Sequence, residues 1–141
     1  MANIRMPQTA RPLLQYCKSH NAKLEDAFFP SFAQMIIFAA SLGWQRDEFD
    51  EATAFCEKDP YPIPLETFKS LGLYDPILII TLARTKNFEV AKSDNEIVAI
   101  IEGFASAGFR YMDKIYGKCE GYEFLQQWVD LISKQSTKSD S

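Results

Sequence analysis

The sequence predicts an all-α protein, a compact single-domain bundle of about five to seven helices around a buried central helix at residues 31–42. A chain of 141 residues has the usual size of one domain. Its apolar fraction of 47% and aromatic fraction of 13% are typical of a protein with a packed core. Its longest apolar stretches are bounded by residues that start and end helices. We place the helical domain at residues 1–132, with residues 1–7 as a loose N-terminal arm and residues 133–141 as a disordered polar tail.

The predicted central helix has a start signal, an end signal and no charged residue between them. Ser31 can cap its N-terminus, and Gln34 three residues later completes a capping box. Gly43 is expected to end the helix in the left-handed conformation, with Trp44 folded back over the last turn. Apolar side chains on every face indicate a helix inside a protein core. At about 12 residues this helix is too short to cross a membrane, which takes about 20.

Residues 7–20 predict the first helix, which we expect to begin near Ala10 or Arg11 because Pro12 is tolerated only in a first turn. The first 23 residues contain four cations and no acidic residue. These cations either contact phosphate or an acidic partner surface, or belong to an ordinary solvated arm. The solvated arm is favoured, because no aromatic ladder alternates with the cations. The four candidate contacts are Arg5, Arg11, Lys18 and Lys23.

The composition becomes acidic between residues 44 and 66, with seven carboxylates and only two cations. Apolar residues recur there at helical spacing, so the sequence leaves open a short helix at about 47–56 or an irregular segment. Carboxylates can hold Mg²⁺, and Asp47, Asp50 and Glu57 would serve in a metal-dependent nuclease. Such a site needs a strand to direct its side chains, and this segment does not read as a strand, so we favour a solvated surface. The candidate acidic partner surface consists of Asp47, Glu48, Asp50 and Glu51.

The middle of the chain predicts a spacer and two helices. Three prolines at alternate positions within residues 59–64 predict an extended spacer that redirects the chain. A short helix is expected at 65–71, closed by a glycine. The next apolar segment, about 75–85, begins with an Asp-Pro pair that suits an N-cap and the first helical position. Its β-branched residues also suit a buried strand, but the capping signal favours a helix.

The longest predicted helix covers residues 94–116 and starts at a second capping box. Its apolar residues repeat at spacings of four and three along one face, which we call the seam. A glycine lies in the seam, where it either lets another helix approach closely or marks a kink. The seam is therefore either a dimer contact or the face that packs on the central helix, and packing is favoured. Its candidate residues are Ile101, Phe104, Gly108 and Tyr111, and a last helix is expected at 122–134.

The residues alone predict no catalytic, cofactor-binding or metal site. The three cysteines are far apart and are expected to be free thiols in a reducing compartment. His20, the single histidine, lies three residues after Cys17, but no third group orients the pair for catalysis. A net charge of −4 argues against a surface devoted wholly to nucleic acid or membrane. No secretory signal or membrane-spanning stretch is recognisable, so we expect a cytoplasmic protein.

The order of four segments carries a family resemblance. These segments are Ala-Ala-Ser-Leu-Gly-Trp at 39–44, Ile-Pro-Leu-Glu-Thr-Phe at 63–68, Leu-Tyr-Asp-Pro-Ile-Leu at 73–78 and Ile-Ile-Glu-Gly-Phe-Ala-Ser-Ala-Gly-Phe at 100–109. Over roughly residues 29–132 the chain resembles the family of DNA phosphorothioation-associated protein 4, also called Dnd system-associated protein 4. The resemblance implies a bacterial setting beside DNA sulfur-modification and restriction genes, and hence anti-phage defence. It supplies no catalytic residues.

The expected function is that of a non-enzymatic accessory or adaptor subunit of such a modification and restriction system. We expect it to act through contacts with other protein subunits, with DNA contacted directly or through the partner, and with a homodimer as a further alternative. The alternative function is a small DNA-binding protein or regulator. Net charge argues against it, and so does the lack of a helix rich in Arg, Lys, Asn and Gln, since helix 94–116 has only Arg110 and Lys114.

Overall fold

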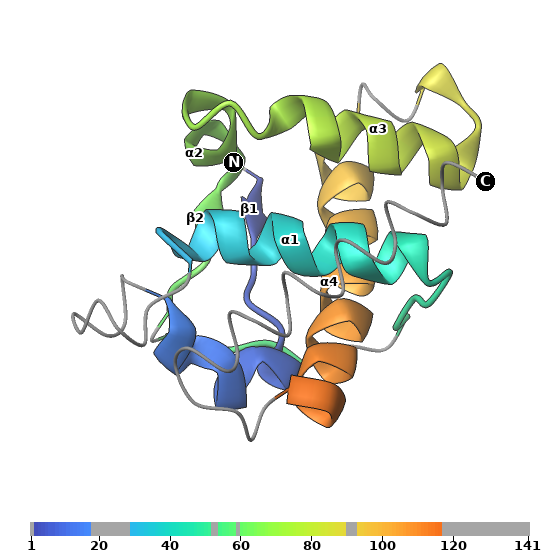
Figure 1. The fold of residues 1–141 in the computed structure, drawn as a ribbon. Coiled ribbons are helices and arrows are strands. Elements are labelled where there is room, and N and C mark those ends of the chain that lie inside the picture. The colour runs from blue at the N-terminus through green and yellow to red at the C-terminus, as the bar shows by residue number, and fades with distance from the viewer. Residues whose placement is uncertain (1, 18–28, 52–53, 59, 90–92, 117–141) are drawn as a thin grey trace.

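The computed structural model describes residues 2–17, 29–51, 54–58, 60–89 and 93–116 (Figure 1). The predicted last helix, the polar tail, and the residues Lys18, His20, Lys23 and Cys119 lie outside these ranges. The described part is mostly helical, but it also contains a small two-stranded sheet that the all-α prediction did not include. Its elements are β1 (Asn3–Ile4), the 3-10 helix η1 (Gln8–Tyr16), α1 (Phe32–Gln45), β2 (Ile63–Pro64), α2 (Leu65–Ser70), α3 (Tyr74–Thr85) and α4 (Asp94–Tyr116).

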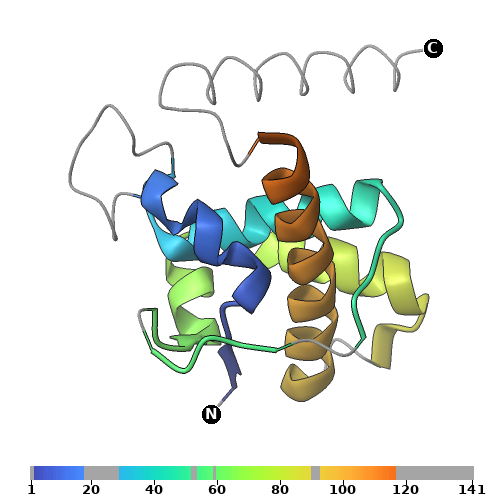
Figure 2. The same ribbon diagram turned by 90° about the horizontal axis from the view of Figure 1, so that it is seen from below.

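Helices α1 and α4 form the centre of the fold. Helix α3 runs beside α1 in nearly the same direction, and α4 crosses both of them (Figure 1). The most extensive contact between elements joins α1 to α4, and η1 and β1 also pack on α4. Seen from below, η1 lies beside the C-terminal half of α4 (Figure 2). The core therefore lies along α4, which is buried on nearly all faces from Ile101 to Phe109.

The start of α1 agrees with the sequence prediction, whereas its end does not. The Ser31 hydroxyl accepts a hydrogen bond from the Gln34 backbone N–H at 3.3 Å and donates one to Gln34 Oε1 at 3.0 Å. Gly43 was expected to close the helix, but α1 continues to Gln45, and the left-handed conformation falls on Asp47, with φ of 55°. Gly43 has another role, because a Cβ there would lie 2.2 Å from the carbonyl oxygen of Phe104.

A second glycine brings the two central helices together one turn further along. A Cβ on Gly108 would lie 1.9 Å from the carbonyl oxygen of Ala39, so only glycine allows α1 to pass this close to α4. Ile101 and Phe104, from the same seam, are 0% and 2% exposed. Of the two alternatives that the sequence left, the seam is therefore the face that packs on α1. Gly108 is buried as well, whereas Tyr111 at the end of the seam is half-buried.

The prediction of a loose N-terminal arm was wrong for the described residues 2–7. β1 pairs antiparallel with β2, with Ile4 opposite Ile63, and the side chains of Ile4 and Met6 are 0% and 1% exposed. The Cys56 backbone N–H donates to the Met6 carbonyl at 2.8 Å, which extends the pairing beyond the strand. Apolar residues at alternate positions 4 and 6 are a strand signal with a period of two, although the stretch is too short to read alone.

Several boundaries also differ from expectation. The first helix is a 3-10 helix that starts at Gln8, with Pro12 inside it rather than in an α-helical first turn. α3 begins at Tyr74, so Asp75 lies in its first turn and makes no capping bond. Gly72, with φ of 75°, follows α2 as predicted. No helix forms at 47–51 or 54–56, the described parts of the possible helix at about 47–56, so the irregular alternative holds there. Within the described residues, no helix is both long enough and apolar enough to cross a membrane.

Candidate functional site

The candidate site is built on residues 46–51, which we call the strap. The strap leaves the C-terminus of α1 and runs beside α4 (Figure 2). Its backbone is bound to both helices, because the Glu48 N–H donates to the Gly43 carbonyl of α1 at 2.9 Å and the Asp50 N–H donates to the Gly103 carbonyl of α4 at 3.1 Å. These two bonds hold an irregular segment in one position against two helices.

The Phe49 ring is the apolar anchor of the strap. It meets the Phe104 ring edge to face, with ring centres 5.0 Å apart, and the Arg84 guanidinium lies 4.4 Å from its centre. A Cβ on Gly103 would lie 2.3 Å from the Phe49 ring, so the glycine provides the space in which the ring lies against α4. Helices α3 and α4 thus both hold the strap through one aromatic side chain.

Charged groups join the strap to the polar side of α4. The Asp50 carboxylate accepts hydrogen bonds from Arg110 Nη2 at 2.8 Å and from the Ser106 hydroxyl at 2.9 Å. The bond to Asp50 raises the pKa of Arg110. Glu48 lies between two guanidiniums, 3.3 Å from that of Arg46 and 3.9 Å from that of Arg110. These charges alternate in sign in the order Arg46, Glu48, Arg110 and Asp50, so each guanidinium is held by a carboxylate.

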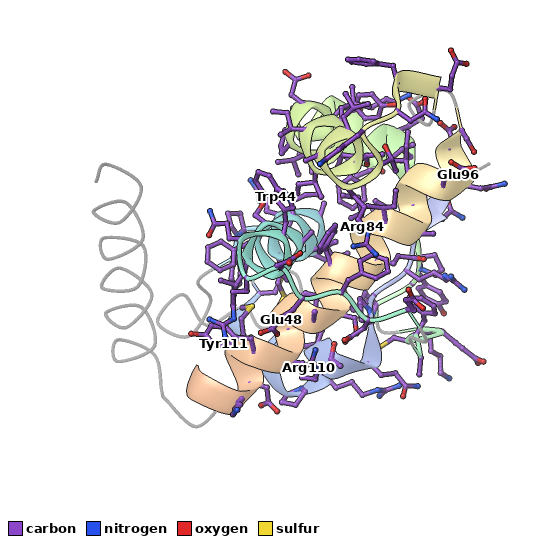
Figure 3. The ribbon with its side chains drawn as sticks, turned by 90° about the vertical axis from the view of Figure 1, so that its right-hand side faces the viewer. Trp44, Glu48, Arg84, Glu96, Arg110 and Tyr111 are labelled. Carbon is purple, nitrogen blue, oxygen red and sulfur yellow. The ribbon has the colours of Figure 1, made fainter. Side chains whose placement is uncertain are left out.

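Two aromatic residues, Tyr111 and Trp44, lie near these charges. The guanidinium carbon of Arg46 lies 3.7 Å from the centre of the Tyr111 ring. Trp44, at the end of α1, is 38% exposed, and Figure 3 shows it on the same face of the molecule as Glu48, Arg110 and Tyr111. We call Trp44, Arg46, Glu48, Arg110 and Tyr111 the strap surface. Trp, Tyr and Arg are the residue types that dominate binding energy at protein interfaces, so this arrangement suits a protein contact.

The four residues of the predicted acidic partner surface fall into two groups in the structure. Glu48 and Asp50 are tied to arginines, whereas Asp47 and Glu51 are exposed. Within the described residues no group of three or more His, Cys, Asp or Glu side chains could hold a metal ion, so Asp47, Asp50 and Glu57 are not brought together into such a group. Cys17 and Cys56 are both buried.

The predicted basic set is also divided. Arg5 binds Glu102 through three hydrogen bonds, from its backbone N–H at 2.8 Å, from Nε at 2.9 Å and from Nη2 at 3.0 Å. The pKa of Arg5 is raised by this contact, and its guanidinium also lies 3.7 Å from the centre of the Phe55 ring. Arg11 is exposed, while Lys18 and Lys23 lie outside the described residues. The charge of Arg5 is therefore paired within the chain, while its side chain is 49% exposed.

The sequence reasoning missed Glu102, whose side chain is only 3% exposed. A signal for it existed, because Glu102 is the one charged residue between Ile97 and Phe109. Ser106 and Arg110 follow it at spacings of four, which places all three on one face of α4. This polar stripe is the face that binds β1, η1 and the strap, since Arg5, Thr9 and Asp50 each hydrogen-bond to it.

Residues 3–141 match the family model described as DNA sulphur modification system-associated protein 4. The comparison with curated proteins and the comparison with solved structures gave no match.

Proposed function

Because this chain belongs to the DNA sulphur modification system-associated protein 4 family, we propose that it is a non-enzymatic accessory subunit of a bacterial DNA phosphorothioation system. In this proposal it acts as an adaptor in anti-phage modification and restriction. It binds other protein subunits of the system and brings no catalytic group of its own.

The strap surface is the observation that supports an adaptor. The side chains of Arg46, Arg110 and Tyr111 are held in place before a partner arrives, by the Arg46–Tyr111 stack and by the ion pairs of Glu48 and Asp50. Side chains that are already ordered lose less conformational entropy on binding, so more of the contact energy appears as affinity. Arg110 is 54% and Arg46 36% exposed at the side chain, so both remain accessible to a partner.

The same contacts make direct DNA binding the weaker proposal. A phosphate-binding surface needs cations whose charge is not already neutralised. In the described residues Arg5, Arg46 and Arg110 each lie within an ion pair with a carboxylate. Phosphate would have to displace those carboxylates before it gained a contact.

The test is a tagged purification from the native host, with identification of the proteins that co-purify. We expect stoichiometric recovery of a modification, restriction or ATPase subunit with the wild-type chain. Trp44→Ala should reduce that recovery, because loss of an interface hot spot of about 2 kcal/mol lowers affinity roughly 30-fold. Tyr61→Ala is the matched control, because Tyr61 is an aromatic residue outside the strap surface and is 68% exposed. Equal loss with both variants would contradict a role for the strap surface.

Recovery of the chain alone, or with nucleic acid only, would contradict the adaptor proposal and favour the DNA-binding alternative. Duplex-DNA binding at two salt concentrations then tests whether the chain makes phosphate contacts. Affinity that depends on phosphate contacts falls steeply as salt rises.

A further inference from the structure

The outer face of α3 is apolar although no described element covers it. Ile79 is 58% exposed on this face, and Phe88, just beyond the helix, is 80% exposed. Leu71, just before the helix, is 47% exposed. Helix α3 lies at the outer edge of the molecule (Figure 1), and its residues Ile77 and Ile80 are buried. Exposed apolar residues on one helix face mark a contact site more often than isolated ones do.

The residues along this face form a palindromic pattern. Asp75, Ile79 and Leu82 lie on one side of α3 at spacings of four and three, and Lys86 follows four residues later as the C-cap, with its backbone N–H bonded to the Leu82 carbonyl. The order is acid, apolar, apolar, base. Asp75 and Lys86 are exposed, and neither has an ion pair among the described residues.

We propose that two copies of this chain associate through α3, with the two helices antiparallel about a two-fold axis. A two-fold contact uses the same surface on both copies, so the pattern must complement itself when reversed. Reversal about the midpoint between Ile79 and Leu82 places Asp75 of each copy opposite Lys86 of the other. It also places Ile79 opposite Leu82, and it brings Phe88 to the region of Leu73, beside the exposed Leu71. A parallel arrangement would place like charges together.

The contact is expected to be weak and reversible. A helix of 12 residues is about 18 Å long, so one helix pair with its flanking residues falls at the lower end of specific interface sizes. The dimer fraction should therefore rise with protein concentration. Because the measurement uses the purified chain alone, its outcome is independent of the adaptor proposal.

The experiment is sedimentation velocity over a concentration series on the full chain and two charge variants. Asp75→Lys leaves only cations at the two charged positions, and Lys86→Glu leaves only anions. Each variant alone should lose the dimer, because like charges then meet at both ends of the contact. An equal mixture of the two should dimerise again, because every cation of the first meets an anion of the second.

Two control variants separate charge complementarity from damage to the helices. Asp113→Lys and Lys114→Glu make the same changes near the C-terminal end of α4, at exposed positions on the end of that helix opposite to α3 (Figure 1). Both should leave dimerisation unchanged. The inference is overturned if the wild-type chain stays monomeric at every concentration, or if each α3 variant alone still dimerises. A mixture of the two α3 variants that stays monomeric, while each remains folded by circular dichroism, also overturns it.

Discussion

Gly108→Ala tests the central helix crossing, because the added Cβ would meet backbone. It would lie 1.9 Å from the Ala39 carbonyl oxygen and 2.6 Å from its carbonyl carbon. Ordinary van der Waals contact begins near 3.4 Å, so α1 must move away from α4 by roughly 1.5 Å. A gap of about 1 Å between packed atoms already loses up to half of their dispersion energy. Such overpacking costs about 3 kcal/mol or more, whereas alanine in place of a helical glycine returns about 1 kcal/mol. We expect a net loss of about 2 to 3 kcal/mol.

Equilibrium unfolding in urea measures this loss as a lower midpoint with an unchanged slope. A thermal scan should show a melting temperature lower by roughly 10 °C. Gly103→Ala is the matched control in the same helix, because its Cβ would meet the Phe49 side chain, which is half-buried and can rotate away, rather than backbone. We expect it to cost less than Gly108→Ala. If Gly108→Ala proved as stable as the wild type, helix propensity would outweigh packing, and the close approach of α1 to α4 would be refuted.

Three further changes test other contacts by the same unfolding measurement. Arg5→Ala should destabilise the protein by about 3 kcal/mol, because it leaves the buried Glu102 carboxylate without its guanidinium. Adding Glu102→Leu should recover part of this loss. No loss of stability in Arg5→Ala would show that the pair is not formed. Because the contact raises the pKa of Arg5, this stabilisation should be constant from neutral to mildly alkaline pH and decline only when arginine deprotonates. Ser31→Ala should cost about 1 kcal/mol through loss of the N-cap bond, and Ser31→Asp, which keeps a capping oxygen, should cost less. Gly72→Ala should cost about 1 kcal/mol from backbone strain alone, since nothing lies within 4 Å of the added Cβ; a neutral effect would contradict the positive φ.

Local signals in the sequence determined most of the helices. Capping residues and apolar periodicity placed α4 at its observed bounds, and they placed the start of α1 at Ser31. These signals act between residues three or four apart, so they can be read without knowing the rest of the chain. The segment order was also enough to indicate the family that the match over residues 3–141 shows.

Only the tertiary structure decided which distant residues meet. In the sequence, Gly43 resembles a glycine that ends a helix and Gly108 one that kinks a helix. Their role in the fold is set by the backbone of the other helix, which lies close to Gly43 at Phe104 and close to Gly108 at Ala39. Arg5 looks like a free cation until Glu102, 97 positions away, is placed beside it. The strap surface likewise joins α1, an irregular segment and α4, whose side chains share no local pattern. Contacts between such distant positions depend on how the helices pack, and helix packing is not encoded in any single stretch of residues.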